Sequence, residues 1–270
     1  MSSTSAPPPP AMGPSPSPEM QAGVATTSDN RTAAKIVRLD GCLWASKSPE
    51  VQKACYLSNV CTSAPPKCCR FKSIPGILQD GPTCGLTALS MAFSGNPSPL
   101  EFLEEAKRRN FTLNGEMFSA ENLFQLICDF AREKCVPVEC QLHEGRLNCA
   151  KVKDHLRSGA CIFVPYDPDF NHGPCLKLGH KAHWALLIGY LIDFDDEFYV
   201  LSRHGKARNI AVWSLKLLSS SNSNLLEFAQ PKGYPHTDFL LPEGGIGGEH
   251  GLRNRAIIVK GLPAETINLV

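Results

Sequence analysis

The sequence contains no hydrophobic run long enough to cross a membrane and no excess of charge of either sign. The longest apolar run near its middle covers only residues 184–192, whereas a membrane-spanning helix needs about 20 residues. Lys and Arg together number 27 and Asp and Glu 26, so the formal net charge is +1. Such a balance creates no global field for nucleic acid or anionic lipid. We therefore expect neither as a partner, and recognition must depend on local sites.

The N-terminus lacks the basic start and the apolar stretch of a secretory signal, and we therefore expect a cytoplasmic protein. In that compartment the twelve cysteines are expected to be reduced thiols, metal ligands or a nucleophile rather than disulfides. The segment 60–69 is rich in cysteine, but Cys61, Cys68 and Cys69 lack the repeated C-x2-C spacing of zinc modules. An exposed segment without metal is the favoured interpretation there.

Composition divides the chain into three parts. Residues 1–30 are rich in proline, with four in a row at 7–10, and have almost nothing to bury, so a disordered tail with polyproline II character is expected. Residues 31–72 form a poorly defined N-terminal segment with two short candidate helices, at 33–39 and 49–57. The dense hydrophobic pattern from 73 to 270 indicates one folded domain without internal repeats.

Helical patterns occupy the first half of that domain. Leu86, Leu89 and Phe93 recur at helical spacing. Ser98 followed by Pro99 and Glu101 has the signature of a capping box, which marks the start of a second helix. Further helices are expected over 119–134 and 149–158.

Strand patterns follow in the second half of the domain. Short runs rich in β-branched and aromatic residues, bounded by Gly, Pro or Asp, occur at 160–165, 183–191, 197–202, 209–214 and 255–261. Helices first and strands later indicate an α+β fold, in which a helical layer packs on a mostly antiparallel sheet. A cleft is expected at the boundary between the two layers.

Cys84 follows a Gly-Pro loop and begins the first helical pattern. The free N–H groups and the positive dipole end of a helix stabilise a thiolate, which would lower the pKa of this cysteine from about 8.5. The alternative is a half-buried cysteine that serves only as a small hydrophobic residue.

Two further residues favour a nucleophilic role for Cys84. Gln79 lies five positions earlier, close enough for its side-chain amide to share an oxyanion site with the Cys84 main-chain N–H. His183 opens an apolar strand about a hundred residues later, where its ring can lean over a cleft as general base. A solvated loop amide and a satisfied core histidine are the structural alternatives.

These residues lie in the first and last of four motifs: QDGPTCGLTALSMA from 79, GEMFS from 115, VPYDPDFNHGPC from 164 and GHKAHWALLIGY from 179. In this order they resemble the papain-like cysteine peptidases related to the bacteriocin-leader-processing group, and in particular the family of actin maturation proteases. The resemblance spans residues 74 to 260 and includes the proline-rich tail.

The resemblance implies a papain-like fold and assigns three roles: Cys84 as nucleophile, His183 as general base and acid, and Gln79 as oxyanion partner. It also implies an aminopeptidase that removes an N-acetylated Met or Cys from immature actin and exposes the mature acidic N-terminus. No cofactor or metal is expected. Actin would be the substrate, and profilin a possible partner of the proline-rich tail.

The residue that orients His183 is not evident. Papain-like relatives usually carry Asp or Asn on the strand after the histidine strand, but this strand has Ser202 and Arg203. The open candidates are Asp167, Asp169, Asn171, Asp195 and Asp196.

Two other interpretations concern the surroundings of His183. His172, Cys175, His180 and His183 have side chains that bind zinc, so a non-catalytic or zinc-binding interaction module is the alternative function. An acidic substrate also requires nearby cations, for which the sequence offers Lys177, Lys181, Arg203, Lys206 and Arg208.

Overall fold

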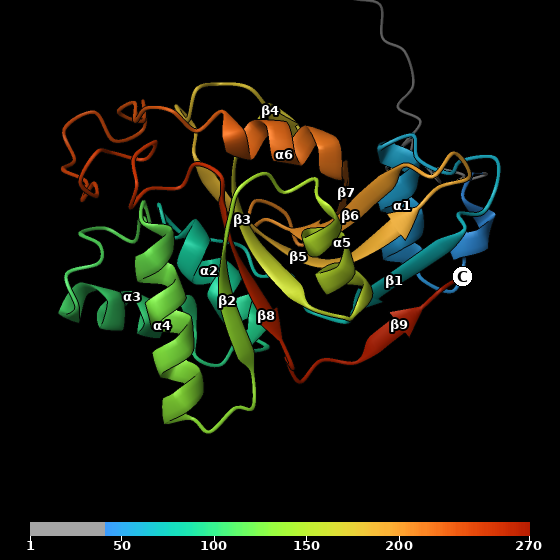
Figure 1. The fold of residues 1–270 in the computed structure, drawn as a ribbon, viewed down its shortest axis with the longest axis horizontal. Coiled ribbons are helices and arrows are strands. Elements are labelled where there is room, and N and C mark those ends of the chain that lie inside the picture. Colours follow the sequence, from blue (N-terminus) through green and yellow to red (C-terminus); the bar gives the residue numbers. More distant parts are fainter. Residues whose placement is uncertain (1–40) are drawn as a thin grey trace, which may run out of the picture. The chain divides into compact units, whose positions relative to one another are not determined.

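The computed structural model describes residues 41–270, which form a mixture of helices and strands (Figure 1). The proline-rich tail and the candidate helix at 33–39 lie outside these residues. The helices are η1 (Leu43–Ala45, a 3-10 turn), α1 (Pro49–Leu57), α2 (Cys84–Ala92), α3 (Pro99–Arg108), α4 (Ala120–Glu133), α5 (Ala150–Arg157) and α6 (Leu215–Ser223). None of the described helices combines the length and the apolar character required to cross a bilayer.

The strands form an antiparallel sheet with β5 at its centre. They are β1 (Cys68–Lys72), β2 (Glu139–Glu144), β3 (Cys161–Pro168), β4 (Pro174–Cys175), β5 (His183–Ile192), β6 (Phe198–Arg203), β7 (Ala211–Ser214), β8 (Arg255–Lys260) and β9 (Thr266–Asn268). The order along the main path is β2-β8-β3-β5-β1-β9; β6 pairs with β5 and β7, and the short β4 pairs with β3.

Strand β5 pairs with three other strands, β3, β1 and β6. Its first half pairs with β3, with Tyr166 opposite His183, and its second half pairs with β1, while β6 runs along its other edge. The pairing of β5 with β6 shifts register between Leu187 and Gly189, where the partner on the other edge of β5 changes from β3 to β1. His183, at the first position of β5, is thus held at one end of a strand that is hydrogen-bonded on both edges.

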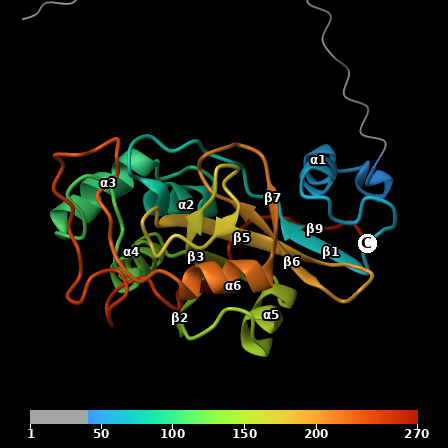
Figure 2. The same ribbon diagram turned by 90° about the horizontal axis from the view of Figure 1, so that it is seen from above.

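Helices cover both faces of the sheet. Side chains of α1, α2, α3 and α4 pack in one core cluster with Trp184 and Leu186, whereas those of α5 and α6 pack in a second cluster with Ala185 and Leu187. Alternate residues of β5 therefore face opposite clusters, as the pleat of a strand requires. Figure 2 shows α2 and α3 on one side of the sheet and α5 and α6 on the other. The single helical layer expected from the sequence is only one of two.

Most of the predicted elements are confirmed. The helices expected from 84, 98, 119 and 149 and the five expected strands are all present. The capping box is also confirmed, since Ser98 Oγ accepts from the Glu101 N–H and the Glu101 carboxylate accepts from the Ser98 N–H. The turn η1, helix α6 and strands β1, β2, β4 and β9 were not predicted.

Residues 41–72 belong to the same compact unit as the rest of the described chain. Strand β1, N-terminal to the boundary predicted at residue 73, lies between β5 and β9 in the sheet. The side chains of Val51 and Cys55 in α1 are buried in the first core cluster. The predicted helix at 49–57 is confirmed as α1.

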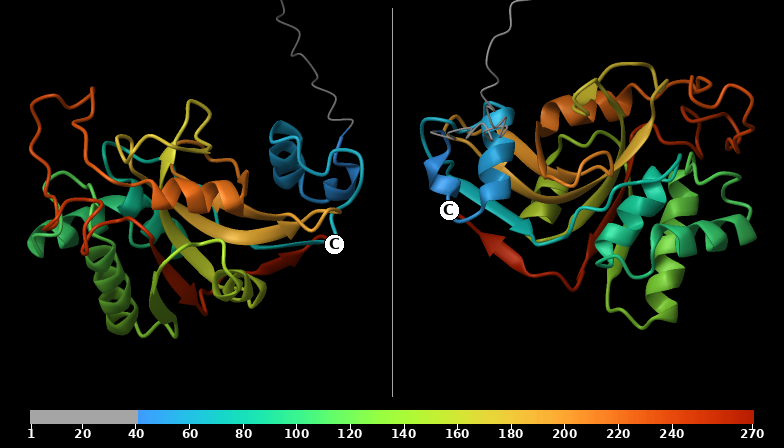
Figure 3. Two further views of the ribbon diagram at one scale, coloured as in Figure 1. Left: turned by 45° about the horizontal axis from the view of Figure 1, so that its top comes forward. Right: turned by 180° about the vertical axis from the view of Figure 1, so that it is seen from behind.

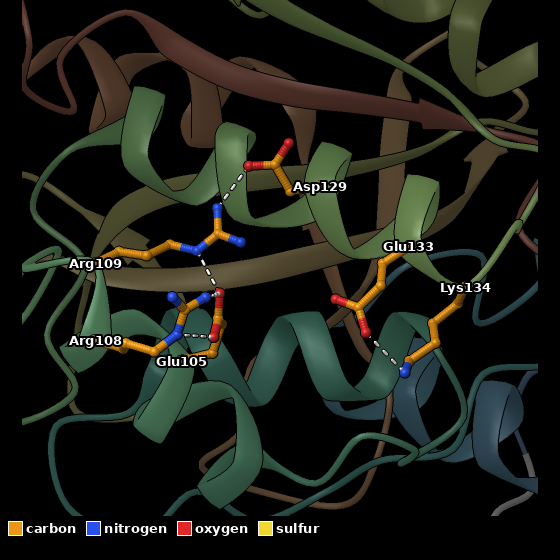
Figure 4. A network of polar contacts seen from close by, with 6 residues as sticks. All are labelled: Glu105, Arg108, Arg109, Asp129, Glu133 and Lys134. Atoms are coloured by element: carbon orange, nitrogen blue, oxygen red, sulfur yellow. Dashed lines mark hydrogen bonds and ion pairs between the residues drawn. The ribbon is translucent and has the colours of Figure 1, made fainter.

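A polar network joins α3 to α4 at the surface (Figure 4). Glu105 binds both Arg108 and Arg109, and Arg109 reaches Asp129 of α4 with an N–O distance of 2.5 Å. Exposed ion pairs each contribute about 1 kcal/mol or less. This network therefore supports the packing of α3 on α4, which the aromatic ring pair Phe102 and Phe130 also holds.

The long connection from α6 to β8 folds over the end of the sheet near α2 and α3 (Figures 1 and 3). Its anchor is Glu116, 2% exposed, whose carboxylate accepts N–H groups of Leu113 and Asn114 and also that of Leu240. Asn114 adds a side-chain hydrogen bond to the Asp238 carbonyl at 2.7 Å. Segments 113–116 and 238–240, far apart in sequence, thereby form one rim.

Candidate active site

A cleft of about 1090 Å³ lies where these connections meet. It is lined by residues from the segments 79–84, 116–118, 168–184 and 228–239, together with Lys206. Cys84, His183 and Gln79 all line it. The three predicted site residues, which span more than a hundred positions of sequence, are therefore brought to one cavity.

Cys84 is the first residue of α2 and is half-buried. The preceding Thr83 donates its hydroxyl to the Asp80 carbonyl at 2.5 Å, which fixes the loop before the helix. Gly85 allows the helix to approach its neighbours, because a Cβ there would lie 3.0 Å from the Met117 Cβ and 3.1 Å from the Trp184 Cδ1. A larger residue at 85 would push the thiol away from β5.

The thiol of Cys84 is influenced by burial and by nearby donors in opposite directions. Burial raises its pKa above the ordinary value, and this effect outweighs the N–H groups of Trp184, Gly85 and Cys84 itself and the Lys206 ammonium, which lower it. The sequence prediction of a lowered pKa is therefore wrong. That prediction took account of the N–H groups at the helix N-terminus, which are present, but not of the desolvation of the charged sulfur, which raises the pKa.

The ring of His183 is held by a main-chain carbonyl. Its Nε2 atom lies 2.5 Å from the His204 carbonyl oxygen. A carbonyl can only accept a hydrogen bond, so Nε2 carries the proton and, in the neutral ring, Nδ1 has a free lone pair. The Tyr166 ring packs edge-on against the imidazole, with centroids 5.8 Å apart.

Burial lowers the pKa of His183 to about 3, although the His204 carbonyl opposes the change, while the charges of Lys206, His204 and His172 reinforce it. His183 is only 5% exposed. With the Cys84 pKa raised and the His183 pKa lowered, the free site holds a neutral thiol and a neutral imidazole. The arrangement is suited to a proton transfer from sulfur to Nδ1 when an electrophile is bound.

Gln79 lies beside the turn that follows β6. Its main-chain N–H donates to the Gly205 carbonyl at 2.8 Å, and its side-chain nitrogen donates to the Gly81 carbonyl at 2.7 Å. A primary amide nitrogen carries two hydrogens, so one remains available toward the cleft. The side-chain oxygen is buried without a partner among the described residues.

None of the candidates expected to orient His183 binds its ring. The carboxylate of Asp167 accepts the main-chain N–H groups of Lys177, Gly179 and Lys181. Asp169 binds the N–H groups of Asn171 and Gly173 in its own turn. Asp195 and Asp196 lie in the turn between β5 and β6, at the opposite end of β5 from His183. The acceptor is instead the carbonyl of His204.

The possible zinc ligands are not assembled. No group of three or more His, Cys, Asp or Glu side chains within residues 41–270 is arranged to hold a metal ion. His180 pairs with Glu227 at 2.7 Å, and His183 is committed to the His204 carbonyl. Cys175 lies in β4, opposite Asp167 of β3. His172, His180 and His183 line the cleft, whereas Cys175 does not.

Only some of the predicted cations reach the cleft. Lys177, Lys181 and Lys206 line it, together with Lys232. Arg203 is buried instead, where its guanidinium binds Glu50 and donates to the carbonyls of Ile74 and Arg208. The expectation that Arg203 faces an acidic substrate is wrong, because its guanidinium is buried and paired with the Glu50 carboxylate of α1.

Several site residues were missed by sequence reasoning. The His204 carbonyl and the Trp184 N–H act through the main chain, so no residue type signals them. The rim residues Phe228, Tyr234 and Phe239 lie in the long connection before β8, a region without periodicity. The one sequence signal near the His204 carbonyl is Gly205, which indicates a turn after β6.

The fold and the site define an α+β protein of mixed helices and antiparallel sheet, with a thiol at a helix N-terminus and an oriented imidazole in one cleft. The family model described as actin maturation protease-like, C-terminal domain, matches residues 74–191, which include all three site residues. This match covers the motifs from Gln79 to the end of β5.

Relatives that align beyond the segment 74–191 agree with that match. The chain is 54% identical to an actin maturation protease of Drosophila melanogaster over 90% of both chains. It is 32% identical to one of Danio rerio, over 72% of this chain and 75% of the relative. It is also 30% identical to one of Homo sapiens, over 69% of this chain and 64% of the relative. The chain belongs to the actin maturation protease family, and it is a peptidase.

Proposed function

We propose that this chain is a cysteine aminopeptidase that removes the N-acetylated first residue, Met or Cys, from immature actin. The observation that carries the proposal is the pairing, in one cleft, of a thiol at a helix N-terminus with an imidazole whose Nδ1 lone pair is free. Family membership supports peptide hydrolysis, and the relatives' name supports actin as the substrate.

In the proposed reaction the Cys84 sulfur attacks the carbonyl carbon of the acetylated residue while its proton passes to Nδ1 of His183. The oxyanion is held by the Cys84 N–H and the free amide hydrogen of Gln79. His183 then protonates the leaving amine, which is the new N-terminus of actin. Water, activated by His183, hydrolyses the thioester and releases the acetylated amino acid.

The charge of the cleft supports an acidic substrate. Four lysines line it, Lys177, Lys181, Lys206 and Lys232, against the carboxylates of Glu116 and Asp169. The Glu116 carboxylate is buried under three main-chain N–H groups, and Asp169 accepts N–H groups of its own turn. The lysine charges thus remain available for the acidic residues that follow the cleaved bond.

The helix α2 packed against a central antiparallel sheet, with the histidine on a strand of that sheet, supports a papain-like fold. We extend the proposal to a cytoplasmic location, where actin is made, and to profilin as a partner of the tail 1–30. The profilin part is tested by deletion of residues 1–30: binding of profilin should weaken, and unchanged affinity contradicts it.

The decisive experiment follows the N-terminal mass of acetylated actin incubated with wild type or with Cys84→Ala. Wild type should release one acetylated residue, and Cys84→Ala should release none. Cys149→Ala is the matched control, because Cys149 is also a half-buried cysteine at a helix start, that of α5, outside the cleft. Cleavage by Cys84→Ala would refute the mechanism, and loss of wild-type activity with a chelator would favour the zinc alternative.

A further inference from the structure

The turn after β6 binds two of the three proposed site residues and lines the cleft together with the third. The His204 carbonyl accepts from Nε2 of His183 at 2.5 Å, and the Gly205 carbonyl accepts from the Gln79 main-chain N–H at 2.8 Å. The Lys206 ammonium lies close enough to the Cys84 sulfur to lower its pKa. Three consecutive residues thus face base, oxyanion partner and nucleophile.

The conformation of this turn is fixed by the His204 side chain. Its Nδ1 atom accepts the Lys206 main-chain N–H at 3.3 Å, which closes the turn. The ring is 4% exposed and packs between His172 and Trp213, with centroid distances of 5.3 and 5.8 Å.

Gly205 fits the turn because it has a φ of +72°, in the left-handed region. A Cβ at this position would lie 3.3 Å from Oε1 of Gln79. A side chain at 205 would therefore disturb both the turn and the amide that it adjoins.

We propose that the turn His204–Lys206 positions the site and that the His204 main-chain carbonyl, rather than a carboxylate or amide side chain, orients the His183 imidazole. His204 is thus a positioning residue: its ring holds the carbonyl in place through the Lys206 N–H. The expected effect on kcat rests on the proposed function. The expected effect on the tautomer of His183 does not.

Charged and titratable groups near His183 come from several elements. His172 approaches from the loop after β3, and His204 and Lys206 from the turn, while Cys84 of α2 lines the same cleft. Among the side chains considered from the sequence, the carboxylates of Asp167 and Asp169 bind main-chain N–H groups elsewhere, and Asp195 and Asp196 lie at the far end of β5. The main-chain carbonyl is therefore the acceptor that sets the tautomer.

The test compares His204→Ala with His204→Asn, whose side-chain oxygen can accept the N–H two residues on, as Asn does in tight turns. Histidine labelled with ¹⁵N reports the tautomer of His183 in the free protein, and cleavage of an acetylated acidic peptide gives kcat and KM. Wild type should show the tautomer with the proton on Nε2. His204→Ala should give a mixture of His183 tautomers and lower kcat at least 10-fold, with KM within about twofold of wild type. His204→Asn should restore the wild-type tautomer and most of kcat.

The matched control is His143→Ala, since His143 is also a buried histidine whose Nε2 lies near a main-chain carbonyl, that of Arg146, but outside the cleft. It should change neither readout. If His204→Ala does not fold, Gly205→Ala tests the same proposal, because a side chain at 205 displaces the backbone of the turn and with it the His204 carbonyl. A His183 spectrum unchanged in a folded variant overturns the proposal, even if the enzyme proves inactive on actin, because that spectrum needs no substrate.

Discussion

The carboxylate of Asp167 accepts the main-chain N–H of Gly179 at 2.7 Å. Asp167 is fully buried one position after Tyr166, the residue that pairs with His183, yet it serves the loop after β4 rather than the imidazole. Its other hydrogen bonds, from the N–H groups of Lys177 and Lys181, are 3.0 Å long. A carboxylate next to the site thus shapes the cleft wall.

Replacement of Asp167 by Asn should loosen that wall without releasing His183. Asn offers one acceptor oxygen in place of two charged ones, and a hydrogen bond to a charged group contributes about 1.5–3 kcal/mol. We expect the free energy of unfolding to fall by roughly 2–3 kcal/mol and KM to rise, with the His183 tautomer unchanged. Urea unfolding and the ¹⁵N spectrum check both parts. Asp195→Asn, at the far end of β5, should behave as wild type, and a changed tautomer in Asp167→Asn would restore Asp167 as the orienting residue.

The buried histidines should make the fold sensitive to acid. Burial lowers the pKa of His183 to about 3 and that of His204 to about 4, from 6.5. Below pH 6.5 the unfolded chain therefore binds protons that the folded chain does not, so stability is complete above that pH and falls as the pH drops toward 4. Each histidine should cost roughly 2 kcal/mol at pH 5.

Urea unfolding at pH 7.5 and pH 5 measures this loss. His204→Asn removes one of the two groups, so the difference between the two pH values should shrink by about 2 kcal/mol in that variant. An equal difference in wild type and variant would mean that His204 titrates normally in the folded protein.

Loss of the Glu116 carboxylate should free the rim of the cleft. It holds N–H groups from Leu113 and Asn114 on one segment and from Leu240 on the other. In Glu116→Ala we expect faster amide hydrogen exchange across 234–241, because that connection loses its anchor, and a fall in stability of about 2 kcal/mol. Glu104→Ala, an exposed glutamate on α3, serves as control. Unchanged exchange at 234–241 would contradict the anchoring role.

A reversed charge at Lys206 should weaken turnover of an acidic substrate. Its ammonium lowers the pKa of Cys84 and lines the cleft. We expect kcat/KM of Lys206→Glu to fall about 10-fold at low salt and the difference to narrow as salt increases, because exposed charges are screened. Lys216→Glu, outside the cleft on α6, should retain wild-type kinetics at both salt concentrations. A loss that is independent of salt would argue against a role of the charge in attraction.

Removal of Glu50 should be severely destabilising. Arg203 is buried with a side chain only 6% exposed and is paired with Glu50, which also accepts the Ile210 N–H. Glu50→Ala leaves a buried guanidinium without its carboxylate, for which a loss of about 3 kcal/mol is expected. Denaturant unfolding provides the measurement, with Glu104→Ala on the exposed face of α3 as control. A cost below that of an exposed ion pair would show that Arg203 does not depend on Glu50.

The elements with strong local signals were predictable. Ser98 and Glu101 form their capping box from side chains within one turn, and the continuous apolar run of β5 follows from its burial on both faces. Cys84, Gln79 and His183 could be selected because each carries the residue type that its chemistry requires. Strand β1 was missed because its burial depends on pairing with β5 and β9, more than a hundred residues away in sequence.

The two errors at the site have one cause. The pKa of Cys84 was expected to be low from the helix N-terminus alone, and Arg203 was expected to face substrate from its position beside Lys206. In both cases burial determined the outcome, and burial depends on neighbours from other elements: Trp184 of β5 beside Cys84, and Glu50 of α1 beside Arg203.

The sequence by itself determined which side chains can act as nucleophile, base and amide donor, because those capacities belong to residue types. Only the tertiary structure decided how the base is held. The group that accepts the hydrogen bond from His183 Nε2 is a main-chain carbonyl, which every residue has, so the sequence gives no sign of it. It acquires its role because the turn after β6 brings the oxygen of His204 to the end of β5.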